Sequence, residues 1–237
     1  VSSEEAQLEQ CETLKQLLVI MCGVVENEGE DVSRLCFYAL SVISPHIDAD
    51  MLQYPQICTH FFNFISAIFG VHAPNLGLLD DAMFDMLLRA LDVGLHQTDD
   101  NIQMTALIAI SKVSSFQFKM LGNKGIDVLQ SKRVFLAQFI TTLLKWLLFE
   151  DGFSNDLLTS ASSAYFGLIC AEYDAYRETV QLLIQDQTDP DTQARLEELF
   201  GSLLTGVDMT WNANMRKAFY VNMSKFVPAA RAMLHRR

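Results

Sequence analysis

Apolar side chains recur at intervals of three and four residues along almost the whole chain, and this period constrains the fold more than any other feature. Near the start it is carried by Leu8, Cys11, Leu14, Leu18 and Met21, which share one face of a helix. No Asn-Gly or Asp-Gly pair joins two runs of alternating polarity, the usual signature of a β-hairpin. Half of the 237 residues are apolar, which is enough for a large core. The sequence therefore predicts an all-α protein.

Polar, glycine-containing and proline-containing segments interrupt the period and divide the chain into about ten helices. Asp80 and Ser154 are suited to cap helix N-termini, whereas Pro55 and Pro190 are suited to first turns. The first predicted helix ends before residue 26, and the others cover 32–44, 55–71, 81–95, 99–121, 127–149, 155–170, 172–186, 190–204 and 210–237. Residues 46–54 are predicted to form a connector with one helical turn, and residues 72–80 a loop.

The connections between these helices are mostly short, which favours pairing of neighbours. Ten helices paired antiparallel give five units of about 45 residues, the period of two-helix HEAT repeats. We therefore predict an all-α fold, an α-α superhelix or HEAT-repeat solenoid, in which each unit packs on its neighbours. A compact bundle of ten helices is the alternative. The predicted single array, 1–237, has pairs at about 1–45, 46–96, 97–150, 151–188 and 189–237.

The opening, VSSEEAQLEQ, is acidic, lacks Met and does not resemble a signal peptide. We expect the chain to be a fragment of a longer solenoid.

The predicted helix over 155–170 combines a buried character with unusually small side chains. Ser160, Ser163 and Gly167 lie three and four residues apart and share a face. Small residues allow neighbouring helix axes to approach closely. This pattern is expected of a helix packed between its own partner and the next repeat, and hydrogen bonds from the Ser hydroxyls to carbonyls four residues earlier would satisfy them.

The net charge of −12 is unevenly distributed. Residues 1–208 hold all 29 acidic residues and 11 of the 17 basic ones, a balance of −18. Residues 209–237 hold six basic residues and no acidic residue. An acidic body favours basic protein partners and disfavours direct binding of nucleic acid; solubility alone is the other explanation. The longest apolar run, 136–149, is too short to cross a membrane, so no membrane insertion is expected. The bases of the last segment are Arg216, Lys217, Lys225, Arg231, Arg236 and Arg237.

No arrangement of residues indicates catalysis. The five cysteines form no CxxC pair and lie in apolar helical contexts, so reduced core thiols are expected and no metal site. The five histidines form no metal-ligand spacing, and neither a Walker A loop nor a GxGxxG motif is present. Most paired carboxylates fall at predicted helix ends, where capping explains them. We predict no enzyme and no cofactor.

Two polar stripes are the candidate partner-binding sites. The first lies on the predicted helix 81–95 and the second on 172–186, which are both second helices of their pairs. If second helices line the concave side of a solenoid, both stripes face its groove and attract a basic partner; an ordinary solvated face is the alternative. The candidates are Asp81, Asp85, Arg89, Asp92 and His96 in the first stripe, and Asp174, Arg177 or Glu178, Gln181 and Gln185 in the second.

Three stretches resemble the late repeats of exportins of the importin-β (karyopherin) superfamily. They read DMLQYPQICTHFFNFISAIFGVHAPNLGLLDDAMFDMLLRALDVGL at 50–95, NDLLTSASSAYFGLICAEYDAYRETVQLLIQDQTDPDTQARLEELFGSLL at 155–204, and RKAFYVNMSKFVPAARAML at 216–234. The exportin-4 type is most similar and the exportin-7 type next, and the resemblance covers about 190 residues. The letters that carry most of the second match are Leu168, Cys170, Tyr176, Val180, Gln187 and Pro190.

This resemblance implies a nuclear export receptor that binds cargo together with Ran-GTP in the nucleus and releases both in the cytoplasm. It implies basic protein cargo, with a hypusine-containing translation factor as the candidate, and nucleoporins as further partners. The main Ran-GTP contact is expected in N-terminal repeats that this chain lacks, so the chain would supply part of a C-terminal arch. A helical-repeat scaffold without Ran dependence, or an α-helical enzyme, are the alternatives.

Overall fold

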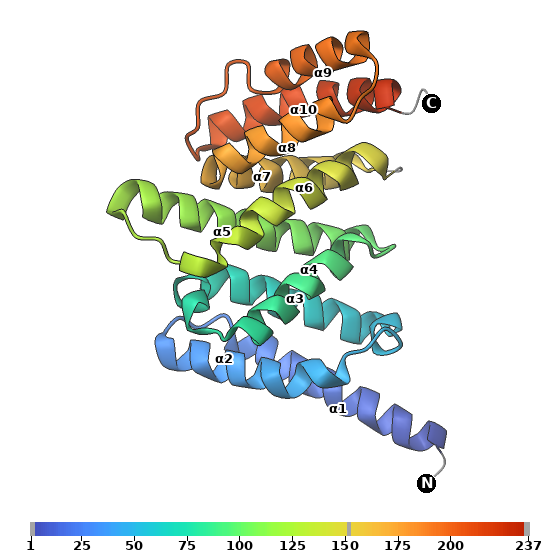
Figure 1. Ribbon diagram of the computed structural model, residues 1–237. Coiled ribbons are helices and arrows are strands. Elements are labelled where there is room, and N and C mark those ends of the chain that lie inside the picture. Colours follow the sequence, from blue (N-terminus) through green and yellow to red (C-terminus); the bar gives the residue numbers. More distant parts are fainter. Residues whose placement is uncertain (1–2, 151–152, 235–237) are drawn as a thin grey trace. The chain divides into compact units, whose positions relative to one another are not determined.

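The computed structural model describes residues 3–150 and 153–234, and in these residues it contains ten α-helices, four short 3-10 helices and no strand (Figure 1). Successive helices run back and forth and are joined by short connections. The α-helices are α1 (Ser3–Val24), α2 (Glu30–Ile43), α3 (Pro55–Val71), α4 (Asp81–Leu95), α5 (Asp100–Lys124), α6 (Val134–Phe149), α7 (Asn155–Ala171), α8 (Tyr173–Gln185), α9 (Pro190–Leu203) and α10 (Ala213–Leu234). The 3-10 helices are η1 (Ser44–His46), η2 (Met51–Gln53), η3 (Ala73–Leu78) and η4 (Gln130–Arg133).

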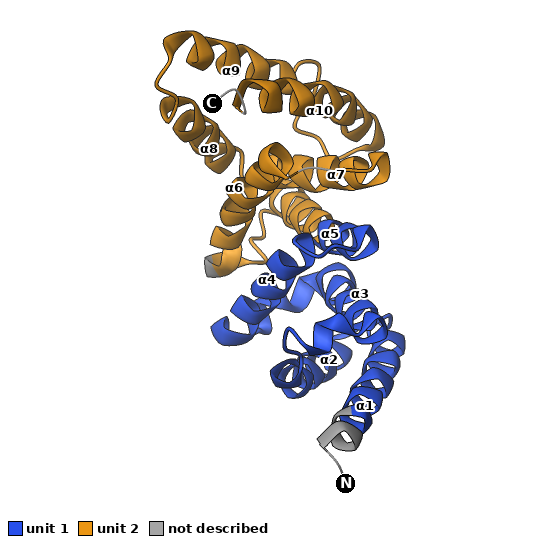
Figure 2. Ribbon diagram, turned by 90° about the vertical axis from the view of Figure 1, so that its right-hand side faces the viewer, with its two compact units in different colours: residues 1–109 blue, residues 110–237 orange. Residues whose placement is uncertain are grey.

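The predicted all-α, helical-repeat fold is confirmed. The chain divides into two compact units, residues 1–109 and 110–237, and the boundary falls within α5 (Figure 2). By residue range, the five predicted pairs would hold α1 and α2, α3 and α4, α5 and α6, α7 and α8, and α9 and α10. The division into these pairs stays a prediction. Their assembly into one array over 1–237 stays a prediction.

The core of the first unit lies where α3 packs against α1 and α4. Ten of the seventeen residues of α3 are buried, which is why this helix is apolar on most of its circumference. Phe61 and Phe62 pack edge to face with their ring centroids 5.6 Å apart. Burial of the large α3 side chains stabilises this unit.

The core of the second unit forms between α6 and α7 and between α10 and both α7 and α9. Phe166 of α7 stacks on Phe219 of α10, with ring centroids 5.1 Å apart, and on Trp211, 5.9 Å away. Phe226 of α10 contacts Phe200 of α9 at 4.8 Å. The last helix therefore belongs to the core, although its exposed face is basic.

Helix starts follow the predicted capping chemistry. Asp80 accepts a hydrogen bond from the backbone N–H of Met83 at 2.7 Å, and Ser154 accepts one from Leu157 at 3.2 Å. Pro55 and Pro190 occupy first turns, as predicted. These local signals explain why the predicted bounds of α3, α4, α7 and α9 lie within a residue or so of the observed ones.

Three predicted bounds are wrong, and each has a local cause. The helix predicted over 127–149 begins only at Val134, because the Gln117 side chain donates to Asp127 at 2.7 Å and accepts from the N–H of Leu129 at 3.2 Å. Those bonds hold residues 127–129 outside a helix. The loop predicted at 72–80 contains the 3-10 helix η3. The last helix begins at Ala213 rather than near 210, because Asn212 accepts from the N–H of Met215 at 2.9 Å.

The small residues of α7 allow a close approach to α5, as predicted. Ser163 forms a hydrogen bond with Ser111 of α5 through their hydroxyls, 3.2 Å apart. A Cβ atom on Gly167 would overlap the Ser114 hydroxyl and lie 3.2 Å from the Trp211 ring. Buried Ser162 donates to the carbonyl of Leu158 four residues earlier, so its hydroxyl is satisfied inside the core.

Candidate partner-binding surfaces

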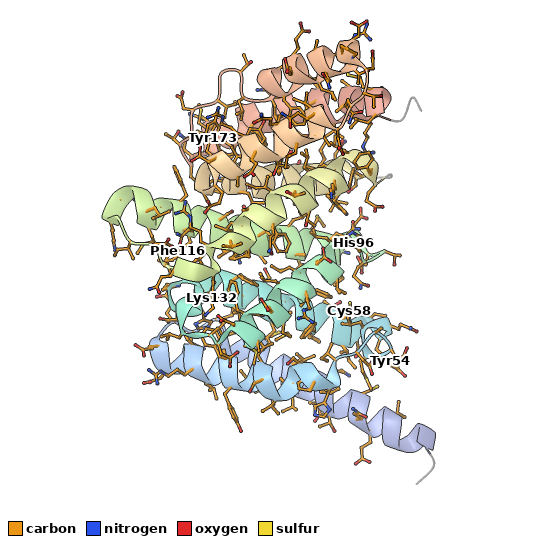
Figure 3. The ribbon with its side chains drawn as sticks, in the orientation of Figure 1. Tyr54, Cys58, His96, Phe116, Lys132 and Tyr173 are labelled. Atoms are coloured by element: carbon orange, nitrogen blue, oxygen red, sulfur yellow. The ribbon has the colours of Figure 1, made fainter. Side chains whose placement is uncertain are left out.

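The first predicted stripe lies on the exposed face of α4. Phe84, Leu87 and Leu91 turn into the core, and the stripe residues lie on the opposite side of the helix because of the 3.6-residue period. Figure 3 labels His96, which follows the C-terminal end of α4, and its Nδ1 lies 2.9 Å from the carbonyl oxygen of Asp92. The exposed stripe residues are Asp81, Asp85, Arg89, Asp92 and His96.

The second predicted stripe lies on α8 in the other unit. Tyr176 and Ile184 are the buried residues of this helix, so it presents most of its surface outward. The exposed residues are Asp174, Arg177, Glu178, Gln181 and Gln185. The structure thus places each stripe on one helical face. That both stripes face one groove stays a prediction, because they belong to different units.

The second unit also contains a groove of about 540 Å³ between α8 and α9. Its α8 wall includes three residues of the predicted stripe, Arg177, Gln181 and Gln185. Its floor is apolar, with buried Ile184 and Phe200 from the two helices. The complete lining is Tyr173, Tyr176, Arg177, Val180, Gln181, Ile184, Gln185, Glu197, Phe200, Gly201 and Leu204. An apolar floor between polar rims is suited to an amphipathic ligand.

Two tyrosines near the start of α8, Tyr173 and Tyr176, line this groove, and Tyr176 contacts Tyr165 of α7. Tyr173, labelled in Figure 3 and 43% exposed, has its ring centroid 6.1 Å from that of Tyr176, which lies 6.1 Å from that of Tyr165. Burial raises the pKa of the Tyr165 phenol well above its ordinary value and also raises the pKa of Tyr176. Both phenols are therefore neutral, and the inner part of the groove is apolar without added charge.

The start of α8 is fixed by a partly buried ion pair between Arg133 and Glu172. Glu172, at the N-cap of α8, accepts a hydrogen bond from Nε of Arg133, and a second guanidinium nitrogen donates to the carbonyl of Ala171 at 3.1 Å. Burial raises the pKa of the Glu172 carboxyl, and the Arg133 charge acts in the opposite direction. Arg133 also lies 3.8 Å from Asp127. The connector before α6 is thereby tied to the helix that carries the second stripe.

The first unit holds a buried polar cluster at the C-terminal end of α3. Nδ1 of His72 lies 2.8 Å from the Ser33 hydroxyl, and Nε2 lies 3.0 Å from the carbonyl oxygen of Val25. Asn75 donates to the same Ser33 oxygen at 2.7 Å. Burial lowers the pKa of His72, and the Val25 hydrogen bond partly opposes this effect. These hydrogen bonds connect the C-terminal ends of α1 and α3 with α2 and η3, so the role of the cluster is structural.

All five cysteines are free, and four are buried, as expected of core thiols. Burial raises the pKa of Cys36 to about 11 and that of Cys170 to about 12. Thiols of this kind stay protonated near neutral pH and are poor nucleophiles. Among the residues that the structure describes, no group of three His, Cys, Asp or Glu side chains is placed to hold a metal ion.

The basic last segment is partly used for packing. Arg231 donates to the carbonyl of Leu147 at 2.9 Å and lies over the Phe153 ring, 4.8 Å from its centroid. Arg216 lies 5.2 Å from the centroid of Trp211. Lys217 and Lys225 are exposed, whereas the predicted bases Arg236 and Arg237 lie outside the described residues. No helix in the described part of the chain has the length and apolarity needed to cross a membrane.

Sequence reasoning missed the α9 side of the groove. The sequence assigns no binding role to Glu197, Phe200 or Gly201. The period of α9 places these three residues on one face, but only its packing beside α8 shows that the face borders a groove. The α8 side was predictable because its polar stripe is visible in the sequence.

Comparison with known proteins identifies what the chain is similar to. A family model described as Exportin-4 matches residues 6–237. Exportin-4 of Dictyostelium discoideum is 25% identical over 208 residues, which cover 87% of this chain and 18% of that protein. Ran-binding protein 16 of Drosophila melanogaster is 24% identical over 226 residues, covering 87% of this chain and 20% of that protein. The chain spans about a fifth of the length of these curated relatives.

Proposed function

Because the chain belongs to the exportin-4 family, a family of nuclear export receptors, we propose that it forms part of a receptor that binds protein cargo together with Ran-GTP. The receptor carries this cargo from the nucleus to the cytoplasm and therefore shuttles between the two. The observation that carries the proposal is the family match over residues 6–237. The name of the Drosophila relative, Ran-binding protein 16, supports Ran as the nucleotide-binding partner.

The contribution proposed for this chain is part of the cargo surface. Its support is electrostatic, since the balance of residues 1–208 is −18 and acidic residues predominate in the exposed stripes of α4 and α8. Such surfaces attract basic proteins and raise the rate of encounter. A hypusine-containing translation factor is the proposed cargo, because hypusine is a long cationic side chain. Ran-GTP is proposed to bind mainly to other repeats of the receptor, and nucleoporins are proposed partners during passage.

The test is to measure cargo binding by the receptor that contains this segment, with Ran loaded with either GTP or GDP. The immobilised receptor is incubated with the purified hypusine-containing factor at low salt, and bound factor is quantified. We expect strong capture with Ran-GTP and weak capture with Ran-GDP. Capture that does not depend on the nucleotide would contradict the proposal and favour a scaffold that assembles proteins without Ran.

A further inference from the structure

The groove between α8 and α9 has the dimensions of a site for a helix. Its α8 wall extends from Tyr173 to Gln185, and at 1.5 Å per residue this corresponds to about 18 Å, or three helical turns. Buried Ile184 and Phe200 form the floor from opposite sides. The described residues contain no strand, and therefore no sheet edge to which an extended segment could be added. Packing of a third helix between two helices is the mode that this geometry suits.

Gly201 leaves open space in the groove. It lies on the exposed face of α9, and no heavy atom lies within 4 Å of the position that a Cβ atom would occupy. Gly167 of α7, by contrast, is enclosed by Ser114 and Trp211. The space at Gly201 therefore does not serve packing inside this unit, and it can receive a large apolar side chain from outside.

The charged residues of α8, α9 and their connector indicate the sign of the charge that a ligand of the groove carries. The segment from α8 through α9 carries seven exposed carboxylates and two exposed guanidinium groups, those of Arg177 and Arg195. Glu197 and Arg177 line the groove, and the other groups lie elsewhere on the two helices or on the connector between them. The excess of carboxylates gives this segment a negative potential. This potential repels nucleic acid, anionic membranes and acidic peptides, and it attracts cations. The carboxylates are those of Asp174, Glu178, Asp186, Asp189, Asp191, Glu197 and Glu198.

We propose that the groove between α8 and α9 binds a basic amphipathic helix of a partner protein, with an apolar side chain seated over Gly201. Leu or Phe side chains at positions i, i+3, i+4 and i+7 of that helix cover the floor. Its Lys and Arg side chains lie towards Glu197 and the exposed carboxylates of the surrounding α8–α9 segment. This inference rests on the proposed function, from which it takes that the partner is a protein cargo. It adds the surface of the chain that binds the partner and the secondary structure that is recognised.

The experiment uses the chain and a synthetic peptide, without Ran. The probe is a fluorescein-labelled peptide of about 14 residues with Leu at i, i+3, i+4 and i+7 and Lys at the other positions. Fluorescence anisotropy gives its Kd for the chain and for Gly201→Trp, which fills the groove. Gly122→Trp is the matched control, because Gly122 of α5 also has open space at its Cβ position and is not part of the groove lining. We expect Gly201→Trp to raise the Kd by about tenfold or more and Gly122→Trp to leave it unchanged.

Two further comparisons make the result decisive. A peptide with Glu in place of Lys should not bind, and a peptide with the same composition but a scrambled, non-amphipathic order should bind at least about tenfold more weakly. If circular dichroism shows that Gly201→Trp does not fold, Gln181→Lys replaces it, because this exposed position on the groove wall would then repel the basic peptide. Gln181→Lys should also raise the Kd by about tenfold.

Equal binding by the groove variants, or by the scrambled peptide, would overturn the proposal, as would no binding of the original peptide at about 1 mM. The outcome is separable from that of the proposed function. If the peptide does not bind but the receptor captures cargo in a Ran-GTP-dependent manner, only the groove proposal is contradicted. Peptide binding together with nucleotide-independent capture would contradict the export function and leave the groove in place.

Discussion

At the scale of single residues, Gly167 sets how closely α7 approaches its neighbours. The absent side chain leaves room for the Ser114 hydroxyl and for the Trp211 ring, which stacks on Phe166. A buried helix ordinarily gains from Ala in place of Gly, because Ala loses less backbone entropy. At this position overlap outweighs that gain, so the glycine is required by packing.

Gly167→Ala should therefore lower the free energy of unfolding by about 1–2 kcal/mol, since overpacking costs more than the helix propensity returns. Gly201→Ala, in open space on α9, should raise it by up to about 1 kcal/mol. Urea denaturation followed by circular dichroism measures both. Adding Ser114→Ala to Gly167→Ala should recover part of the loss, because the overlapping oxygen is removed. Equal effects of the two Gly→Ala changes would contradict this account.

His72 gives the first unit a pH dependence of known sign. Its pKa in the folded chain lies below the ordinary value of 6.5, so below that pH the unfolded chain binds a proton that the folded chain does not. Stability should therefore fall as the pH decreases from about 7 towards the lowered pKa. Urea denaturation at a series of pH values measures the slope. His72→Gln, which keeps a hydrogen-bonding amide but cannot titrate, should flatten it; an unchanged slope in the variant would exclude His72 as the cause.

At the scale of elements, the connector between α5 and α6 is held by side chains rather than by its own backbone pattern. Gln117 of α5 holds Asp127 of the connector, and Arg133, itself in the connector, is bonded to Glu172 at the start of α8. A polar run of this kind, before an apolar one, is typical of a helix start, which is why the sequence predicted α6 too early. The conformation of such a segment depends on contacts with residues distant in the sequence, and hydrophobic periodicity carries no information about those contacts.

The bounds of α3, α4, α7 and α9 were predictable because their signals are local. Asp80, Ser154, Pro55 and Pro190 determine helix starts through their own backbone geometry or through a bond to a residue two or three positions away. The small face of α7 was likewise visible as a spacing. Only the α8 side of the groove could be predicted from the sequence, because tertiary packing places Gly201 of α9 beside α8.

Arg133→Met tests the role of the Arg133–Glu172 pair. The variant leaves the Ala171 carbonyl and the Glu172 carboxylate without their hydrogen-bond donor, so we expect the free energy of unfolding to fall by about 1–3 kcal/mol. This range is lower than for a fully buried pair because Arg133 is partly exposed. Arg34→Met removes the exposed Arg34–Glu30 pair of α2 and is the matched control, with an expected change within about 0.5 kcal/mol.

Glu172→Gln should change stability by less than about 1 kcal/mol, because the cost of burying the carboxylate, seen in its raised pKa, offsets its attraction to Arg133. Thermal denaturation of the three variants provides the comparison. A loss in Glu172→Gln as large as that in Arg133→Met would show that the ion pair, and not the hydrogen bonds of the guanidinium, stabilises this junction.

At the scale of the whole molecule, the two units are helical-repeat structures with acidic exposed faces, and the described residues form no metal cluster. We propose that these acidic faces bind their partner by shape and charge complementarity. Its family is one of nuclear export receptors, and the chain supplies about a fifth of the length of its relatives. Binding through many weak charge contacts predicts an affinity that decreases steeply with salt.

The central claim is that the acidic stripes of α4 and α8 belong to the cargo surface. Its most direct test is the affinity of the full receptor for the hypusine-containing factor with Ran-GTP, measured at about 50 and about 300 mM NaCl. The variant carries Asp81→Asn, Asp85→Asn, Asp92→Asn, Asp174→Asn and Glu178→Gln. We predict at least about tenfold weaker binding at low salt and a smaller salt dependence. An unchanged Kd at both salt concentrations would contradict the claim.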